Sequence, residues 1–188
     1  MNGGVRGWLS VVAGQPRIVV DAHLDLSWNA LNWNRDLTLP VSEIRTFEAG
    51  MRERNRAGNT VAFPEMRRGG VAVCLGTLLA RSSNSKEDKL DYRNQQIACA
   101  MAQGQLAYYR LMEEEGQLRM LTDWLSLAAQ IQSWKESGSD SAPLGFVLSM
   151  EGAGPIISPG HVLQWWDAEL RVIGLAHYGA SAYAHGTG

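Results

Sequence analysis

The stretch Gly70-Val-Ala-Val-Cys-Leu-Gly-Thr-Leu-Leu79 contains no charged residue and is entered through a second glycine, Gly69. An uninterrupted apolar run of this length is typical of a strand that is covered on both faces, as the strands of parallel sheets are. Three further runs of similar character cover Arg17 to His23, Leu144 to Met150 and Leu170 to Ala176. Longer segments separate these runs, and the alternation predicts an α/β fold built on a parallel sheet.

The segments between the predicted strands differ in character. Positions 29–68 are polar and rich in arginine and asparagine, so we expect a long loop that reaches over a site. Helical periodicity covers 87–115 and 123–137, with Asp123 as a good N-cap, and a further helix is expected near 161–168. The apolar stripe of the first of these helices would consist of Ile97, Met101, Tyr108 and Met112.

Composition excludes several classes of protein. With 45% hydrophobic residues in 188 positions, the chain can bury a sizeable core. Its net charge of −2 comes from mixed acidic and basic residues, which leaves no basic stripe for nucleic acid or anionic lipid. No run approaches the ~18 to 20 apolar residues of a membrane span, and residues 1–16 form an extension without a convincing signal peptide. We expect a soluble, cytoplasmic protein that acts on a small molecule, with a homodimer as one option for its assembly.

Side chains that can bind metal or transfer a proton stand at the ends of three predicted strands. His23 and Asp25 follow the first strand, Glu151 follows the third, and His177 follows the fourth. Because residues two apart on a strand point the same way, Asp21 would share a face with His23 and Asp25. An imidazole combined with carboxylates suits zinc. Each of these residues alone is equally well explained by a solvated or structural role, and it is the repetition at strand ends that favours a metal centre.

The residues around these side chains form the motifs Val20-Asp-Ala-His-Leu-Asp-Leu-Ser-Trp28, Met150-Glu-Gly-Ala-Gly154 and Gly174-Leu-Ala-His-Tyr178. In order and spacing they resemble the Asp-Gly-His-Asn-Asp-Leu-Pro-Trp, Glu-Gly-Gly and Leu-Thr-His segments of the renal (membrane) dipeptidase family of zinc metallopeptidases. The first motif is the most specific, although alanine and serine replace its usual glycine and proline. The resemblance extends from about Ile18 to the end of the chain.

The resemblance implies a (β/α)₈ TIM barrel of the metal-dependent hydrolase type, a fold whose active sites lie at the C-terminal ends of its strands. A complete barrel needs ~200 to 250 residues or more, so the chain would hold roughly the first four βα units. Residues 1–16 would be an N-terminal extension, and 17–188 the N-terminal half of the catalytic domain. An open half-barrel exposes unpaired strand edges, so we expect this piece alone to be inactive and poorly soluble.

The resemblance also implies a role for each residue in a site with two Zn²⁺. His23 and Asp25 would bind one zinc, Glu151 would bridge both, and His177 would contact the substrate and the developing oxyanion. Asp21 would either orient a metal-bound histidine or play a plain structural role. A hydroxide shared by the two metals would attack the scissile carbonyl of a dipeptide, which makes Glu151 and His177 the catalytic candidates. The family's two further zinc-binding histidines would lie beyond the last residue of this chain.

Two alternatives remain open. The chain could belong to another metal-dependent amidohydrolase that acts on a small amide or lactam, although many of those carry a histidine where Asp25 stands. It could also be a non-catalytic binding or structural domain that retains the motifs without a working metal pair. Outside the motifs, His161 and His185 are expected at the surface, and Trp28 and Trp33 could line a pocket for a substrate side chain.

Overall fold

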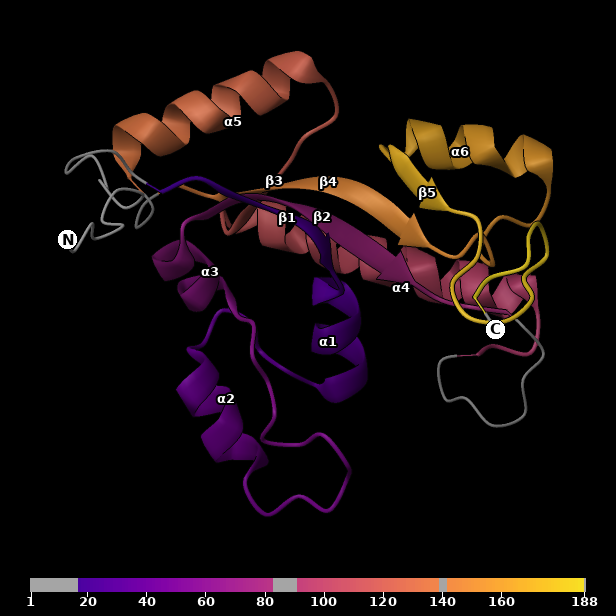
Figure 1. Cartoon of the computed structure of the whole chain (residues 1–188), viewed down its shortest axis with the longest axis horizontal. Helices are drawn as coiled ribbons and strands as arrows, with labels where there is room; N and C mark the ends of the chain where they lie inside the picture. Colours follow the sequence, from indigo (N-terminus) through magenta and orange to yellow (C-terminus); the bar gives the residue numbers. More distant parts are fainter. Residues whose placement is uncertain (1–16, 83–90, 139–141, 188) are drawn as a thin grey trace, which may run out of the picture.

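Among residues 17–82, 91–138 and 142–187, which the computed structural model describes, five parallel strands form one half-barrel sheet (Figure 1). The strands are β1 (Val19–Leu24), β2 (Val71–Leu79), β3 (Leu118–Met120), β4 (Leu144–Glu151) and β5 (Val172–Gly174). β1, β2 and β4 lie side by side in that order. β3 and β5 share the other edge of β4, where β3 pairs with its beginning and β5 with its end.

The mixed α/β class and the parallel sheet predicted from the sequence are confirmed, with two differences. The four predicted strands appear as β1, β2, β4 and β5, but β5 is only three residues long, so His177 lies in the loop beyond it. The additional strand β3 was not predicted, because three residues after the end of a helix form no recognisable run. The proposed extension 1–16 lies outside the described residues.

Three short helices occupy the segment where a long loop was expected. They are α1 (Leu26–Trp33), α2 (Val41–Glu48) and α3 (Phe63–Gly69). At seven or eight residues, each is too short to produce a clear helical period in the sequence. The prediction of a long loop therefore missed these three helices.

The longer helices match their predicted positions more closely. α4 (Gln95–Glu114) begins where the Asn94 side chain accepts a hydrogen bond from the backbone N–H of Ile97 at 2.8 Å. α5 (Trp124–Ser137) begins at Asp123, the predicted N-cap, which forms a capping box with Ser126. A short 3₁₀ turn (Pro159–His161) leads into α6 (Val162–Asp167). No helix among the described residues is long and apolar enough to cross a membrane.

The helices lie on both sides of the sheet, with α5 and α6 above it and α1 to α4 below it in Figure 1. From α4, the Tyr109 ring stacks on Phe146 of β4 with centroids 4.8 Å apart. From α5, the Gln130 side chain lies against the neighbouring Gly145 and donates a hydrogen bond to a β2 carbonyl. Adjacent strand residues point to opposite faces, which explains why these two helices cover opposite sides of β4.

The buried face of α4 differs from the predicted stripe. It consists of Ala98, Ala102, Gln105, Leu106 and Tyr109. The two alanines allow the helix to approach the sheet closely, so the larger side chains of the predicted stripe are only partly covered and Ile97 is 42% exposed. Because all strands are parallel, their carboxyl ends meet at one edge of the sheet, where the arrowheads of β2 and β4 point (Figure 1).

Candidate metal centre

Three of the predicted ligands converge at this edge. His23 lies near the end of β1, Asp25 directly follows β1, and Glu151 ends β4. One ligand atom from each lies within 4.8 Å of those of the other two. The Nε2 atom of His23 is 2.9 Å from Glu151 Oε2 and 3.4 Å from Asp25 Oδ1. One imidazole and two carboxylates therefore surround a single position.

A bulge in β1 decides which side chains reach that position. Asp21 pairs with Cys74 and Leu24 with Gly76, so three steps along β1 match two steps along β2. Paired residues of parallel strands share a face, which places Asp21 and Leu24 on one face. The register shift between them interrupts the simple alternation from which Asp21 was predicted to share a face with His23, and Asp21 is not in the group formed by His23, Asp25 and Glu151. The Asp21 carboxylate instead accepts a hydrogen bond from the His23 backbone N–H at 3.0 Å.

Asp25 stands at the N-cap position of α1, but its side chain makes no capping hydrogen bond there. Its carboxylate is directed to the cluster with His23 instead. Its backbone carbonyl accepts the backbone N–H and the side-chain amide of Asn29, both at 2.9 Å. The first turn of α1 thus fixes the backbone of Asp25, while the carboxylate of Asp25 points toward His23 and Glu151.

Glu151 is held by contacts to both of its carboxylate oxygens. His23 approaches Oε2, and the Nε2 atom of His177 lies 2.6 Å from Oε1. The glycines that follow have separate functions: Gly152 has a positive φ of +83°, and a Cβ atom at Gly154 would lie 3.0 Å from the Ala80 carbonyl. The Gly-x-Gly pattern therefore lets the chain turn sharply beneath the carboxylate and pass close to the end of β2.

Arg81, just beyond β2, was not among the predicted site residues. Its Nη1 atom lies 3.3 Å from Nδ1 of His177, and its Nε atom lies 3.6 Å from Asp91 Oδ1. The side chains of Arg81 and Asp91 are only 9% and 3% exposed. The signal that could have found Arg81 is its position, because it is the first charged residue after the apolar run that predicted β2.

The donor set and its electrostatics fit a divalent cation. Burial, followed by the neighbouring charge of Glu151, raises the pKa of Asp25 above its usual range. The Oδ1 atom of Asp25 is inaccessible to solvent and has no hydrogen-bond donor within the described parts of the chain. A cation among His23, Asp25 and Glu151 would neutralise the repulsion between the carboxylates and provide this oxygen with a partner. The nitrogen and oxygen ligands are those that zinc accepts.

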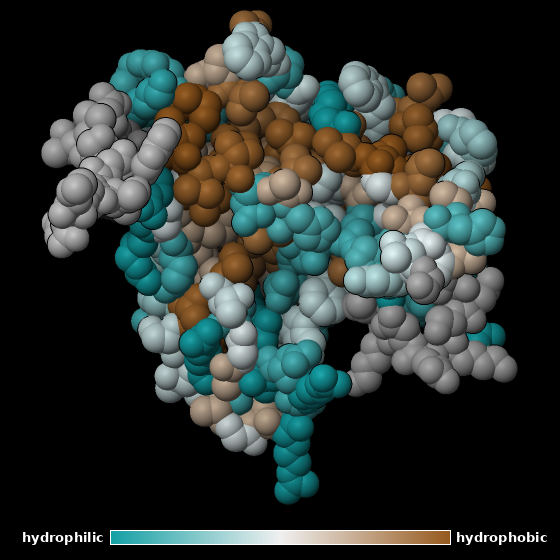
Figure 2. All heavy atoms as spheres, viewed as in Figure 1, coloured by the Kyte–Doolittle hydropathy of each residue, from teal (hydrophilic) through white to brown (hydrophobic). Residues whose placement is uncertain are grey.

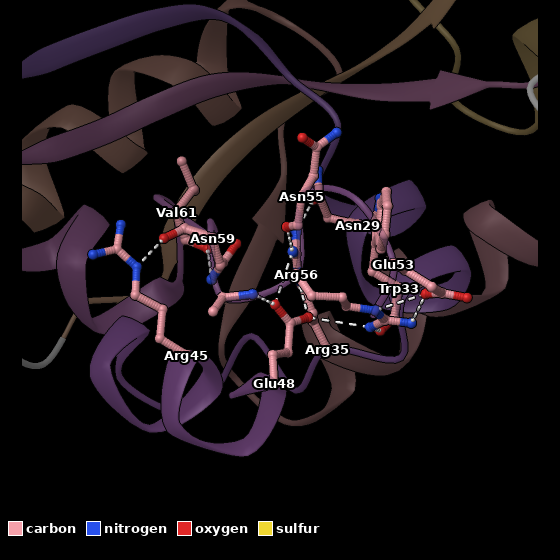
Figure 3. Close-up of polar contacts among 11 residues, drawn as sticks. Asn29, Trp33, Arg35, Arg45, Glu48, Glu53, Asn55, Arg56, Asn59 and Val61 are labelled. Carbon is pink, nitrogen blue, oxygen red and sulfur yellow. Dashed lines mark hydrogen bonds and ion pairs between the residues drawn. The ribbon is translucent and has the colours of Figure 1, made fainter. Parts of the chain in front are cut away.

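A network of charged side chains shapes the segment that follows Asp25 (Figure 3). Glu48 of α2 is 1% exposed and accepts hydrogen bonds from Arg35 at 2.7 and 3.1 Å. It also accepts from Arg56 at 3.2 Å and from the Ala57 backbone N–H at 2.7 Å. The hydrogen bonds from Arg35 hold the pKa of Glu48 below its usual range. Both guanidinium groups lie about 5 Å from the centre of the Trp33 ring.

Arg35 of this network also lines a pocket of about 250 Å³, and Asp25 lies on the same lining. Trp28 and Trp33, predicted to lie in a pocket, both line it. Its polar lining includes Asn29, Asn55 and Asn59. The pocket therefore begins at a metal-ligand candidate and combines aromatic surfaces with amide hydrogen-bonding groups.

The two remaining histidines lie outside the cluster. His161 belongs to the 3₁₀ turn before α6, where its Nδ1 atom faces the Ile157 backbone N–H at 3.3 Å. His185 is exposed close to the end of the described chain. The expectation that His161 is a surface or turn residue agrees with this position.

Comparison with solved structures finds the same architecture elsewhere. The crystal structure of the dipeptidase AC, a metallopeptidase of family M19, is 18% identical with a TM-score of 0.54, and the match covers 88% of this chain and 45% of that one. The probable dipeptidase PvdM from Pseudomonas aeruginosa is 12% identical with a TM-score of 0.58, covering 89% and 36%. A metallopeptidase from Rhodobacter sphaeroides, liganded with a phosphinate mimic of the dipeptide L-Ala-D-Ala, is 16% identical with a TM-score of 0.53, covering 87% and 48%.

This chain spans less than half the length of each of those structures. No family model matches the sequence, and no curated protein matches it. At such low identities the likeness concerns the fold. The resemblance inferred from the motifs is thereby confirmed at that level: the chain shares the fold of the M19 dipeptidases, the membrane dipeptidase family of metallopeptidases, over about 88% of its length.

Proposed function

We propose that this chain carries part of the active site of a zinc-dependent dipeptidase. The observation that carries the proposal is the convergence of His23, Asp25 and Glu151 on one position, from two strands that are not neighbours in the sheet. The motifs that contain these residues resemble the dipeptidase family independently of the structure. The metallopeptidase fold of the solved structures supports the same chemistry.

In the proposed site, His23 and Asp25 would hold one zinc, and Glu151 would be the carboxylate shared with a second. The two oxygens of the Glu151 carboxylate face different partners, Oε2 lying 2.9 Å from His23 and Oε1 2.6 Å from His177. A second metal at Oε1 would replace the contact with His177 and leave its Nε2 atom free to face the substrate. Asp21 supports the first metal through the backbone of His23, to which it is hydrogen-bonded. By the resemblance to the dipeptidase family, two histidines of later strands would complete the second zinc site in a full domain.

The residues of this chain have defined tasks in peptide hydrolysis. When bound, a zinc pair supplies Lewis acidity and lowers the pKa of a water molecule toward neutrality. His177 donates a hydrogen bond through Nε2 to the oxyanion that develops on the substrate carbonyl, a contribution of ~2 to 4 kcal/mol in comparable sites. The pocket beside Asp25 receives a side chain of the dipeptide between Trp28 and Trp33.

The surface of the chain supports its assignment as half of a TIM-barrel domain. Figure 2 shows apolar side chains gathered over the region of the sheet, α5 and α6. The exposed apolar residues of these elements include Trp124, Leu125, Leu163, Trp166 and Val172. Uncovered apolar area of this kind favours association or aggregation. We therefore expect the 188-residue chain alone to be inactive and poorly soluble. We propose separately that the complete polypeptide is a cytoplasmic enzyme.

The test is metal content and hydrolysis in the full-length polypeptide that contains this chain. Two zinc ions per subunit and turnover of dipeptides, with L-Ala-D-Ala among the substrates tried, would support the proposal. Hydrolysis of a β-lactam or another small amide without dipeptide turnover would assign the site to a different amidohydrolase. Absence of stoichiometric metal would leave a binding or structural domain. His161→Gln is a matched control for substitutions of His23, because it removes an imidazole outside the cluster.

A further inference from the structure

We propose that Arg81 is a positioning residue that fixes the tautomer of His177, so that the proton of the neutral ring lies on Nε2 and faces the metal centre. The tautomer assignment stands on contacts within this chain. Only its consequence for catalysis rests on the proposed function. No motif includes Arg81, and nothing in its residue type alone indicates a function.

The guanidinium group of Arg81 determines the hydrogen-bond role of Nδ1 in His177. A guanidinium group has five N–H donors and no acceptor. The Arg81 Nη1 atom lies 3.3 Å from Nδ1 of His177, so Nδ1 has to act as the acceptor in this contact. A neutral imidazole carries a single proton, which then resides on Nε2. A proton on Nδ1 would instead place two donors face to face.

The opposite side of the ring leads to the same assignment. The Nε2 atom of His177 lies 2.6 Å from Glu151 Oε1, and a carboxylate accepts hydrogen bonds. The ring therefore lies between a donor-only group on one side and an acceptor on the other. The edge of the Tyr178 ring packs against it with centroids 4.2 Å apart.

Contacts to its side chain and to its backbone fix the position of Arg81, so it can orient the ring of His177. Its side chain is 9% exposed and forms an ion pair with the almost fully buried Asp91. Its backbone carbonyl accepts a hydrogen bond from the Tyr92 N–H at 2.8 Å. His177, by contrast, lies three residues beyond the short strand β5 and outside its ladder. The ordered end of β2 thus orients an imidazole on a loop.

With its proton on Nε2, His177 presents a hydrogen-bond donor to the carbonyl oxygen of the substrate. When a metal takes up the Glu151 oxygen that His177 faces, Arg81 is the remaining contact that favours a proton on Nε2. Without Arg81, a fraction of His177 would then carry its proton on Nδ1 and present only a lone pair to the oxyanion. Loss of an oxyanion donor affects the transition state more than ground-state binding. Arg81→Met should therefore lower kcat by ~10-fold or more, with little change in KM or zinc content.

The direct test is ¹⁵N nuclear magnetic resonance of the histidine rings in the full-length, metal-free polypeptide, which requires no activity. The His177 signals are identified by their loss in His177→Gln. In the wild type, His177 should show a protonated Nε2 and an unprotonated Nδ1. Because Glu151 also favours a proton on Nε2 in the metal-free protein, the contribution of Arg81 is measured in a Glu151→Ala background, where Arg81→Met should shift both signals toward the averaged values of a mixed tautomer. Arg81→Lys, which keeps a cation with donors only, should retain the wild-type pattern.

Two internal controls separate this effect from general loss of structure. Arg67→Met removes another partly buried arginine, one bonded to Gln117 near the opposite ends of the strands, and should leave the His177 signals unchanged. The signals of His161 should not move in any Arg81 variant. A wild-type His177 with its proton on Nδ1 overturns the proposal even if Arg81→Met does not fold, and so does a His177 spectrum that Arg81→Met leaves unchanged in the folded Glu151→Ala background. The expected spectra in a protein without zinc or peptidase activity would refute the proposed function and leave the tautomer assignment standing.

Discussion

The imidazole of His23 lies 2.9 Å from the carboxylate of Glu151, although β2 separates their strands in the sheet. Adjacent strands are ~4.8 Å apart, so the backbones of β1 and β4 are separated by about twice that distance. The contact forms because both side chains project from the ends of their strands on the same face and meet beyond β2. A metal at this point would fasten two non-adjacent strands together.

Glu151→Gln should abolish stoichiometric metal binding and reduce peptidase activity to background. The substitution keeps the shape of the side chain but removes the negative charge on which a bridging ligand depends. Elemental analysis and isothermal titration with zinc would measure the loss. Full zinc content together with near-normal turnover would contradict the assigned role.

His177→Ala should lower turnover while zinc content stays close to that of the wild type. In the proposed site this residue contacts the substrate, and the group of possible metal ligands among the described residues does not include it. Steady-state kinetics and metal analysis on the same preparation provide the comparison. Loss of zinc would show that His177 is a ligand.

Gly152→Ala and Gly50→Ala form a matched pair, because both glycines have a φ of +83°. Each substitution should destabilise the protein by ~1 to 2 kcal/mol through backbone strain. Only Gly152 adjoins Glu151, so only its substitution should also weaken zinc binding. Thermal melts combined with zinc titrations distinguish the two effects, and equal zinc affinities in both variants would argue against a fixed turn beneath Glu151.

Glu48→Gln should destabilise the fold by ~3 to 5 kcal/mol, because it leaves the buried Arg35 without its carboxylate partner. Glu53→Gln is the control, since this glutamate also pairs with Arg56 but is 60% exposed, and exposed pairs contribute ~0 to 1 kcal/mol. Denaturant unfolding measures both. Equal destabilisation by the two substitutions would show that the Glu48 network contributes no more than a surface pair.

The same carboxylate predicts a pH dependence of stability. The pKa of Glu48 is lower in the folded state than its ordinary value of 4.5, so its stabilisation is fully present above that value. The stabilisation is lost as the pH falls through the folded-state pKa. The difference in unfolding free energy between wild type and Glu48→Gln should therefore be constant near neutrality and shrink below about pH 4.5. A difference that grows on acidification would contradict this sign.

The sequence contained enough information to predict the central strands and the proximity of His23, Asp25 and Glu151. Apolar runs identify β2 and β4 because both strands are buried on both faces, and the ligands stand at strand ends, where their residue types are conspicuous. The register shift that interrupts the alternation after Asp21 could not be predicted, because it arises from pairing with β2. The Arg35–Glu48–Arg56 network could not be predicted, because it joins short helices whose sequences have no clear period. The role of Arg81 could not be predicted either, because it depends on a contact with His177, which is distant in the sequence.

The most direct test of the central claim is a crystal structure of the zinc-soaked, full-length polypeptide with anomalous data collected at the zinc edge. We predict an anomalous peak ~2.0 to 2.2 Å from the Nε2 atom of His23 and from one carboxylate oxygen each of Asp25 and Glu151. A second peak should lie beside the other oxygen of Glu151. Absence of a peak among His23, Asp25 and Glu151, or zinc found only at His161 or His185, would contradict the account.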